Sequence, residues 1–289
     1  MLITKIKGLA NRVRYRLMRE SKLIRKKAID AGVASRIIPG HTGYQKFIIM
    51  GMPRSGSNFL ASSLRSGKNI IAFGELFNEK SHQRRDIQWD TPGYRTTEKA
   101  LRLRDADPVG FLESMVFNRR PVGIEALGFK LFYHHADENW APVWPYLKEQ
   151  DLKVLHLKRK NYLKVHLSMS VARRTREFLS QSSKPRQLAI HLDYDECLQW
   201  FEMTRAWDTE FNTCFKDNLV IHYDDLVIDH ARCMREIQEY LNVRISETSS
   251  PLTKQARLPL EKAILNFDQL KRQFAGSEWA EFFEPEDIS

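Results

Sequence analysis

Short apolar runs alternate with longer amphipathic stretches along most of this chain. Five runs have the length of buried strands, and the stretches between them space their apolar residues as helices do. The expected strands are 47–50, 70–73, 127–132, 152–157 and 219–223. The expected helices are 57–65, 108–117, 138–149, 161–180, 187–216 and 229–241, with a mostly helical stretch over 252–283. This alternation predicts an α/β fold of three layers, with a central parallel sheet of about five strands and helices on both faces.

Two other segments lack this pattern. Residues 36–44 are rich in Pro, Gly and polar groups, which predicts a linker into the first strand. Residues 79–107 are polar and irregular, which predicts an excursion over the surface.

The first apolar run leads into a loop with two glycines, residues 51–58, of sequence GMPRSGSN. A helix that starts near Gly56 would direct its free N–H groups and the positive end of its dipole into this loop. The loop therefore predicts a cradle for phosphate or sulfate. A tight strand-to-helix turn without a ligand is the simpler alternative.

The glycine spacing predicts a P-loop type of fold but not a triphosphatase. It matches the start of a Walker A loop, yet Ser57 stands where that motif has its lysine. A triphosphatase needs this lysine on the β- and γ-phosphates. The cation of this loop is Arg54, before the second glycine, which suits a ligand with one phosphate bearing a leaving group, bound without metal. A nucleotide or metabolite kinase with an aberrant loop remains an alternative.

Polar side chains also follow three other expected strands: Glu75, Lys130 and Arg159. Because ligands bind outside the carboxyl ends of parallel strands, we expect these side chains to converge on the loop. Each has a simpler interpretation as well. Glu75 would be a helix cap or an ion-pair partner, Lys130 a strand-end lysine that reaches solvent, and Arg159 the partner of a carboxylate.

Two further groups of residues are assigned structural roles. Asp224 and Asp225 follow the fifth expected strand, and we interpret them as helix caps. Four tryptophans at helical positions are interpreted as core residues rather than sugar platforms: Trp140, Trp144, Trp200 and Trp207.

Charge divides the chain in two. The net charge is +10, and residues 1–30 account for +8 of it. Apolar residues at helical spacing within this basic segment predict a helix that suits an anionic membrane surface, or else a solvated or subunit-packing helix. We therefore divide the chain into a basic helical arm with linker, 1–44, and a main domain, 45–289. Because the main domain is nearly neutral, no nucleic-acid partner is expected.

Cysteine usage and apolar run length suggest a location. No run approaches the roughly 18 residues of a membrane span, and the N-terminus has no apolar core of a secretory signal. Cys197, Cys214 and Cys233 have neither C-x-x-C nor zinc spacing. These features are typical of a reduced cytoplasmic protein. Peripheral membrane contact through residues 1–30 is an option.

Two segments together resemble a known family. Residues 53–57, PRSGS, resemble the 5′-phosphosulfate loop of sulfotransferases that use 3′-phosphoadenosine 5′-phosphosulfate (PAPS). Residues 156–161, HLKRKN, with Ser168 on the next helix, resemble the 3′-phosphate motif of that family.

The resemblance is closest to bacterial carbohydrate sulfotransferases of the trehalose and nodulation-factor type. It rests on GELF at 74–77, GFKL at 128–131, and the C-terminal segments LTKQA at 252–256 and ILNF at 264–267. It extends over about residues 46–283 and is loose over 79–125 and 175–215. Asn58 replaces a more usual threonine. Phe132 stands where phenol and steroid sulfotransferases have a histidine.

The resemblance implies a reaction and roles for individual residues. The reaction would be in-line transfer of the sulfuryl group from PAPS to a hydroxyl of a carbohydrate or glycolipid, without a metal or a covalent intermediate. Glu75 would be the general base, while Arg54 and Lys130 would stabilise charge on the transferred group. The implied nucleotide-binding residues are Pro53, Arg54, Ser55, Gly56, Ser57, Asn58, Arg159, Ser168, Lys254 and Arg257.

A non-catalytic class remains open beside these two enzyme classes. A membrane or nucleic-acid adaptor would bind through residues 1–30, and its binding would be sensitive to salt. The sequence does not identify the acceptor, and it leaves the oligomeric state open.

Overall fold

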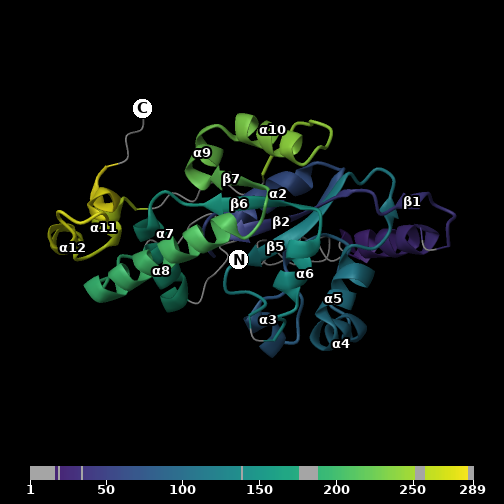
Figure 1. The fold of residues 1–289 in the computed structure, drawn as a ribbon, viewed down its shortest axis with the longest axis horizontal. Coiled ribbons are helices and arrows are strands. Elements are labelled where there is room, and N and C mark those ends of the chain that lie inside the picture. Colours follow the sequence, from purple (N-terminus) through teal and green to yellow (C-terminus); the bar gives the residue numbers. More distant parts are fainter. Residues whose placement is uncertain are drawn as a thin grey trace, which may run out of the picture.

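The computed structural model describes residues 17–18, 20–33, 35–137, 139–175, 188–250 and 258–285. A five-stranded parallel sheet lies at the centre, in the order β3-β5-β2-β6-β7, and helices cover both of its faces (Figure 1). The strands are β2 (Gln45–Gly51), β3 (Ile70–Glu75), β5 (Ala126–Phe132), β6 (Leu152–Lys158) and β7 (Asn218–His222). The expected fold class and all five expected strands are confirmed.

Alternate residues of the strands form two cores, one on each face of the sheet. Phe47 and Ile49 of β2 face the core that α2, α9 and α10 cover. Ile48 and Met50 face the larger core, which α4 to α8 and α12 cover. The helices are α2 (Ser57–Ser66), α3 (Glu79–Gln83), α4 (Glu98–Ala106), α5 (Pro108–Phe111), α6 (Val143–Glu149), α7 (Tyr162–Thr175), α8 (Tyr194–Thr213), α9 (Tyr223–Ile228), α10 (His230–Tyr240), α11 (Leu260–Ala263) and α12 (Phe267–Gln273).

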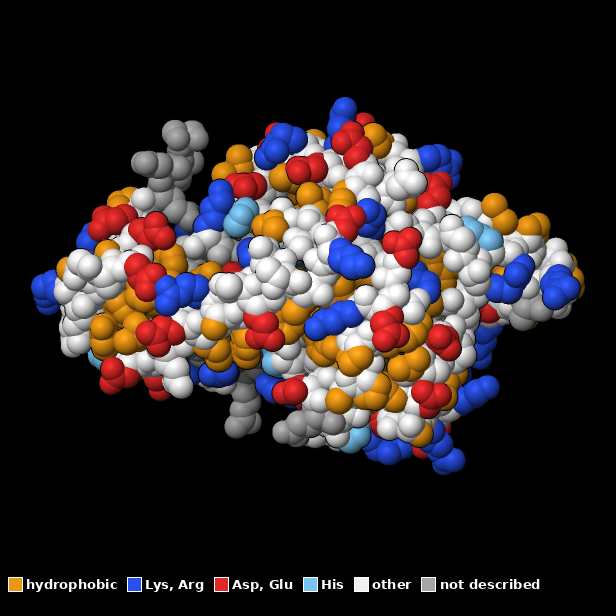
Figure 2. Space-filling view, viewed as in Figure 1, with side chains coloured by type: hydrophobic (Ala, Val, Ile, Leu, Met, Phe, Trp, Pro, Cys, Tyr) orange, Lys and Arg blue, Asp and Glu red, His pale blue; other side chains and the backbone are white. Residues whose placement is uncertain are grey.

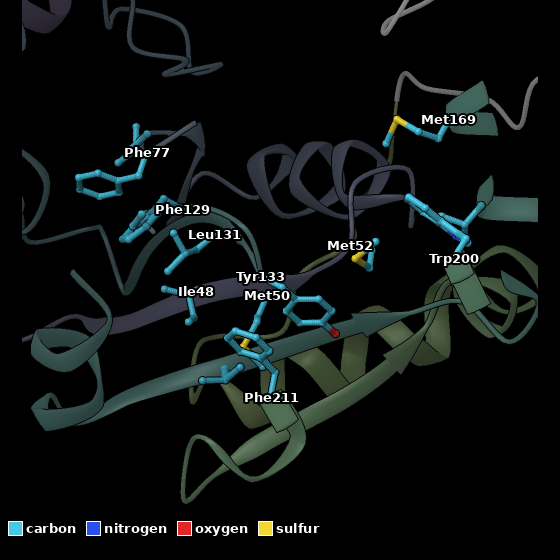
Figure 3. Packing of buried hydrophobic residues seen from close by; sticks show 14 of the residues in the cluster. Ile48, Met50, Met52, Phe77, Phe129, Leu131, Tyr133, Met169, Trp200 and Phe211 are labelled. Atoms are coloured by element: carbon cyan, nitrogen blue, oxygen red, sulfur yellow. The ribbon is translucent and has the colours of Figure 1, made fainter. Parts of the chain in front are cut away.

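The larger core extends to the end of the sheet that carries the loop. Figure 3 shows Met52 of the loop near Trp200, and Tyr133 beside Phe211 and Met50. The rings of Tyr133 and Phe211 stack with centroids 4.6 Å apart. This packing fixes the ends of β2 and β5 against α8.

The segment 79–107 is not the irregular surface excursion that its composition predicts, because it contains α3 and α4. Thr97 caps α4, and the side chain of Arg104 is fully buried. Arg104 donates to the carbonyl oxygens of Leu76 and Asp86, at 3.2 and 2.9 Å. These two hydrogen bonds from the buried guanidinium tie the segment to the end of β3.

Other predicted boundaries also shift. The expected linker 36–44 contains strand β1 (Gly40–His41), which pairs antiparallel with β4 (Arg120–Pro121). The helix expected at 187–216 begins only at Tyr194, because Asp193 caps it. The expected helix 108–117 is α5 followed by a π-helical turn, Leu112–Val116. The helical C-terminal stretch consists of short pieces: α11, α12 and the 3₁₀ turn Ala280–Phe283.

Part of the basic arm packs on the main body. Residues 20–33 are helical, and Lys26 Nζ lies 3.9 Å from the centre of the Tyr94 ring. Residues 1–16 lie outside the described residues, so the division at residue 44 and the membrane contact of the arm stay predictions. No helix among the described residues has both the length and the apolarity needed to cross a membrane. On the face drawn in Figure 2, basic and acidic side chains are interspersed.

Candidate active site

The loop between β2 and α2 has a backbone that requires glycine at two positions. Gly56 has φ 99°, and a Cβ there would lie 2.0 Å from the ring of Tyr223. At Gly51 a Cβ would lie 2.3 Å from the carbonyl oxygen of Leu157. Arg54 between them also has a left-handed conformation, with φ 69°. The loop is therefore tightly curled against the ends of β6 and α9.

This curl leaves backbone donors pointing into the loop. Ser55 closes the loop internally, since its hydroxyl donates to the carbonyl of Met52 at 2.7 Å. The N–H groups of Gly56, Ser57 and Asn58 have no hydrogen-bond acceptor among the described residues. Three free N–H groups at the start of a ten-residue helix form a binding site for an anion.

Arg54 connects this loop to helix α7. Its Nε donates to Ser168 Oγ at 3.0 Å, and the side chain of Ser168 is 8% exposed. Burial lowers the pKa of the Arg54 guanidinium, which nevertheless stays charged, as arginine does in proteins. The loop and the serine expected at opposite ends of a nucleotide thus lie side by side.

Lys130 and Glu75 face each other beside the same loop. The register of β3 against β5 shifts between Phe73 and Glu75, so that Glu75 pairs with Lys130. Lys130 Nζ lies 2.7 Å from Asn58 Oδ1, 3.3 Å from Glu75 Oε1 and 3.3 Å from Asp90 Oδ2. Its side chain is only 1% exposed, so the interpretation of Lys130 as a lysine that reaches solvent is wrong.

Lys130 balances the negative charge of Glu75, because its other two neighbours, an amide and an imidazole, are neutral. Asn78 donates from Nδ2 to Glu75 Oε2 at 2.6 Å, and it is Asn78, not Glu75, that caps α3. His135 Nε2 lies 3.9 Å from the same oxygen. Burial holds the pKa of His135 well below its usual range, so this ring is neutral. Glu75 is therefore an ion-pair partner of Lys130, held in place by an amide.

Arg159 lies on another side of the loop. Its Nη2 is 3.5 Å from Asp224 Oδ1, and its guanidinium lies 4.6 Å from the centre of the Tyr223 ring. Because Tyr223 packs against Gly56, the arginine stands next to the loop. Its Nε is buried and has no hydrogen-bond partner among the described residues. A buried donor of this kind is costly unless a ligand or water satisfies it.

The interpretation of Asp224 and Asp225 as helix caps is wrong. His222 is the N-cap residue of α9, and the two aspartates lie in its first turn. Asp225 pairs with Lys160 at 2.7 Å, as Asp224 pairs with Arg159. The two acids therefore hold the basic segment that follows β6.

A buried polar network holds the N-terminal end of helix α7. Tyr133 donates to Asp208 Oδ1 at 2.7 Å, and its hydroxyl is 2.6 Å from His156 Nε2. Tyr162, the first residue of α7, donates to the other oxygen of Asp208 at 3.0 Å. Burial lowers the pKa of His156 to about 3. The network fixes the start of the helix that carries Ser168.

Sequence reasoning missed three residues at this site: Asn78, Asp90 and Tyr223. Asn78 carried a usable signal, because an asparagine before Glu79 is a common start of a helix. Asp90 lies in a loop and has a φ of 49°. The sequence carries no signal for this conformation. Tyr223 reaches the loop only through the packing of α9.

Lys254 and Arg257 lie outside the described residues. Trp140, Trp144, Trp200 and Trp207 all pack within or against the larger core, as expected. No group of three or more metal-binding side chains occurs among the residues that the structure describes.

A carboxylate, an ammonium, two guanidiniums and an N–H cradle thus gather at one edge of the sheet. Such a set can bind an anionic group and transfer it to a hydroxyl. A family model for the sulfotransferase domain matches residues 44–273, more than half of the chain, so the chain belongs to the sulfotransferase family.

The chain is also similar to individual known proteins. Nodulation protein H of Rhizobium tropici is 27% identical over 253 residues, which cover 85% of this chain and 95% of that protein. Nodulation protein H of Rhizobium meliloti (strain 1021) is 26% identical over 256 residues, covering 83% and 95%. A solved sulfotransferase from Alicyclobacillus acidocaldarius aligns at 19% identity with a TM-score of 0.43, over 80% of this chain and 91% of that one. The expected resemblance to nodulation-type bacterial sulfotransferases is confirmed.

Proposed function

We propose that this sulfotransferase uses PAPS as its donor and a hydroxyl group of a carbohydrate or glycolipid as its acceptor. One observation carries the proposal: residues 51–58 contact Lys130 and Ser168 directly and reach Arg159 through Tyr223. Asn58 meets the Glu75–Lys130 pair, Arg54 meets Ser168, and Gly56 meets the tyrosine that lies against Arg159. A donor with phosphate at both its 5′ and 3′ ends fits such a site.

The unsatisfied donors of the site support a nucleotide with two phosphate positions. The free N–H groups of Gly56, Ser57 and Asn58 suit the 5′-phosphosulfate. The buried Nε of Arg159 suits the 3′-phosphate, for which guanidinium gives planar, charge-assisted contacts. Lys254 and Arg257, implied by the family resemblance, would contribute from the C-terminal segment.

The chemistry divides between Glu75 and its cationic neighbours. PAPS supplies a sulfuryl group bound through an oxygen to the 5′-phosphate. Glu75 accepts the proton of the acceptor hydroxyl while the new O–S bond forms and the S–O bond to the phosphate breaks. Arg54 and Lys130 stabilise the negative charge that develops on the sulfuryl and bridging oxygens. The products are a sulfate ester and adenosine 3′,5′-bisphosphate.

The acceptor class rests on the relatives and on the resemblance of GELF and GFKL to carbohydrate sulfotransferases. The name Nodulation protein H supports an acceptor of the nodulation-factor type. The three free cysteines support a cytoplasmic location, and residues 1–30 would bring the enzyme to a membrane-borne acceptor.

A transfer assay tests the proposal. Purified protein is incubated with PAPS or with ATP and Mg²⁺, together with a set of glycosides, and mass spectrometry identifies the products. We expect sulfate esters from PAPS, without added metal. Phosphorylated products from ATP, with none from PAPS, would favour the kinase alternative instead.

A further inference from the structure

The loop that follows α3 returns to the active site and places Asp90 at the end of β3. The N–H of Gly74 donates to the carbonyl of Trp89 at 3.0 Å. The hydroxyl of Thr91 donates to the carbonyl of Ala72, also at 3.0 Å. Because these two hydrogen bonds flank Asp90 in the sequence, the loop holds this residue firmly beside Glu75.

The backbone around Asp90 is unusual. Its φ of 49° lies in the left-handed region, which few residues other than glycine adopt. A Cβ at Gly74 would lie 2.4 Å from Asp90 Oδ2 and 2.2 Å from the carbonyl of Gln88. The close approach of Asp90 to β3 therefore depends on Gly74, the first residue of GELF. Aspartate adopts this conformation more readily than most residues, and here it brings the carboxylate against β3.

Asp90 is also the most accessible charge of the Lys130 cluster. Its side chain is 37% exposed, against 17% for Glu75 and 1% for Lys130. Lys130 is the only cation within ion-pair distance of Asp90 among the described residues, and it is shared with Glu75. Arg65 adds a more distant positive charge. Apart from this ion pair, no described residue binds the Asp90 carboxylate, and its 37% exposure leaves it accessible beside Lys130.

We propose that Asp90 binds the acceptor by accepting a hydrogen bond from a second hydroxyl, adjacent to the one that Glu75 deprotonates. This inference rests on the proposed function. Glu75 Oε1 and Asp90 Oδ2 each lie 3.3 Å from Lys130 Nζ, so the two oxygens are no more than twice that distance apart. Two hydroxyls on neighbouring carbons can reach both carboxylates with ordinary hydrogen bonds.

The acceptor class that follows is a vicinal diol, as a sugar ring presents. A monohydric alcohol or a phenol would leave the Asp90 carboxylate without the hydroxyl that it is placed to bind. Sites that hydrogen-bond a substrate hydroxyl discriminate strongly against analogues that lack it. Asp90 is then a residue that determines specificity, not the base.

The test compares methyl α-glucopyranoside with its four monodeoxy analogues, using PAPS as donor. For the native enzyme, one deoxy analogue that keeps the reacting hydroxyl should lower kcat/KM by about 10- to 100-fold, the effect of losing one hydrogen bond to a charged group. Asp90→Asn keeps the shape and tolerates the left-handed backbone, and Asp90→Gly removes the side chain without backbone cost. Asp90→Gly should lower kcat/KM for the parent glycoside by about 10- to 100-fold, and Asp90→Asn should lower it less, because the amide oxygen still accepts a hydrogen bond without the charge. On that one deoxy analogue they should cause almost no further loss, because the same hydrogen bond is already missing.

Asp86→Asn is the matched control. It makes the same charge change in the same loop, and Asp86 has no contact with Lys130, so full activity is expected. Affinity for adenosine 3′,5′-bisphosphate should be unchanged in all three variants. Equal losses on every glycoside would show that Asp90 acts only through Lys130, and unchanged rates would show no role; either result overturns the proposal. Native enzyme that binds the bisphosphate but sulfates no glycoside would overturn the carbohydrate acceptor, and this proposal with it.

Discussion

Arg54 Nε donates a hydrogen bond to Ser168 Oγ at 3.0 Å, between residues 114 positions apart in the sequence. It joins the anion loop after β2 to the helix after β6. If the loop binds the 5′ end of a nucleotide and the helix its 3′ end, this contact holds the two binding elements in one arrangement before the ligand arrives. Such preorganisation reduces the cost of ordering the site on binding.

The assignment of Arg159 to the 3′-phosphate leads to a ligand-specific effect. Arg159→Ala should weaken binding of adenosine 3′,5′-bisphosphate by about 10- to 100-fold, because a charge-assisted contact is lost. Binding of adenosine 5′-phosphosulfate, which lacks the 3′-phosphate, should change by less than about threefold. Lys160→Ala, which removes the exposed neighbour paired with Asp225, serves as the control in the same calorimetric titrations. Equal weakening of both nucleotides by Arg159→Ala would contradict the assignment.

Glu75→Gln should separate binding from chemistry. The amide keeps the size of the side chain and can still interact with Asn78 and Lys130, but it cannot accept a proton from the acceptor. We expect kcat to fall by about 10²–10⁴-fold while affinity for adenosine 3′,5′-bisphosphate is retained. The exposed Glu113→Gln should leave both unchanged. Full sulfate transfer by Glu75→Gln would exclude this residue as the base.

The curl of the loop leads to a prediction about stability. Gly56→Ala places a methyl group 2.0 Å from the Tyr223 ring at a φ of 99°, so the free energy of unfolding should fall by about 1–3 kcal/mol. Nucleotide binding should weaken as well, because Tyr223 and the free N–H groups must move. Gly123→Ala meets no atom within 4 Å and should change stability by less than about 0.5 kcal/mol in urea unfolding. Similar unfolding curves for the two variants would show that the loop is not constrained in this way.

Signals within a few residues were enough to predict the sheet and the centre of the site. Apolar runs mark the buried strands, the two glycines of residues 51–58 mark the loop, and parallel strands bring their C-terminal ends to one edge. The convergence of Glu75, Lys130 and Arg159 follows from this topology alone.

The rest of the site depends on features that the sequence does not carry. Asp90 reaches Lys130 through a left-handed backbone and the absence of a side chain at Gly74. The segment around it is polar in composition, yet it packs because the buried Arg104 donates to two backbone carbonyl oxygens. A buried arginine held by backbone carbonyls looks like a surface residue in the sequence.

Buried neutral histidines should make the protein sensitive to acid. Burial lowers the pKa of His156 to about 3 and that of His166 to about 4, below the value of about 6.5 for an unfolded chain. Between these values the unfolded state binds more protons, so the free energy of unfolding falls as the pH decreases from about 6.5 toward 4. Each group contributes up to about 1.4 kcal/mol per pH unit.

Urea unfolding at pH 7 and pH 5 checks this prediction. His156→Gln should be less stable than the native protein at pH 7, because the contact with Tyr133 changes, but it should lose less stability on going to pH 5. The expected difference between the two losses is about 1–2 kcal/mol. Parallel pH dependences would show that His156 does not stay neutral in the folded protein.

Loop 51–58 is assigned to a nucleotide site with two separate phosphate positions. Calorimetric titration with adenosine 3′,5′-bisphosphate and with ATP, each with EDTA and then with Mg²⁺, tests this assignment. We expect the bisphosphate to bind without Mg²⁺, at least about 10²-fold more tightly than ATP. Mg²⁺-dependent binding of ATP, with no binding of the bisphosphate, would contradict it.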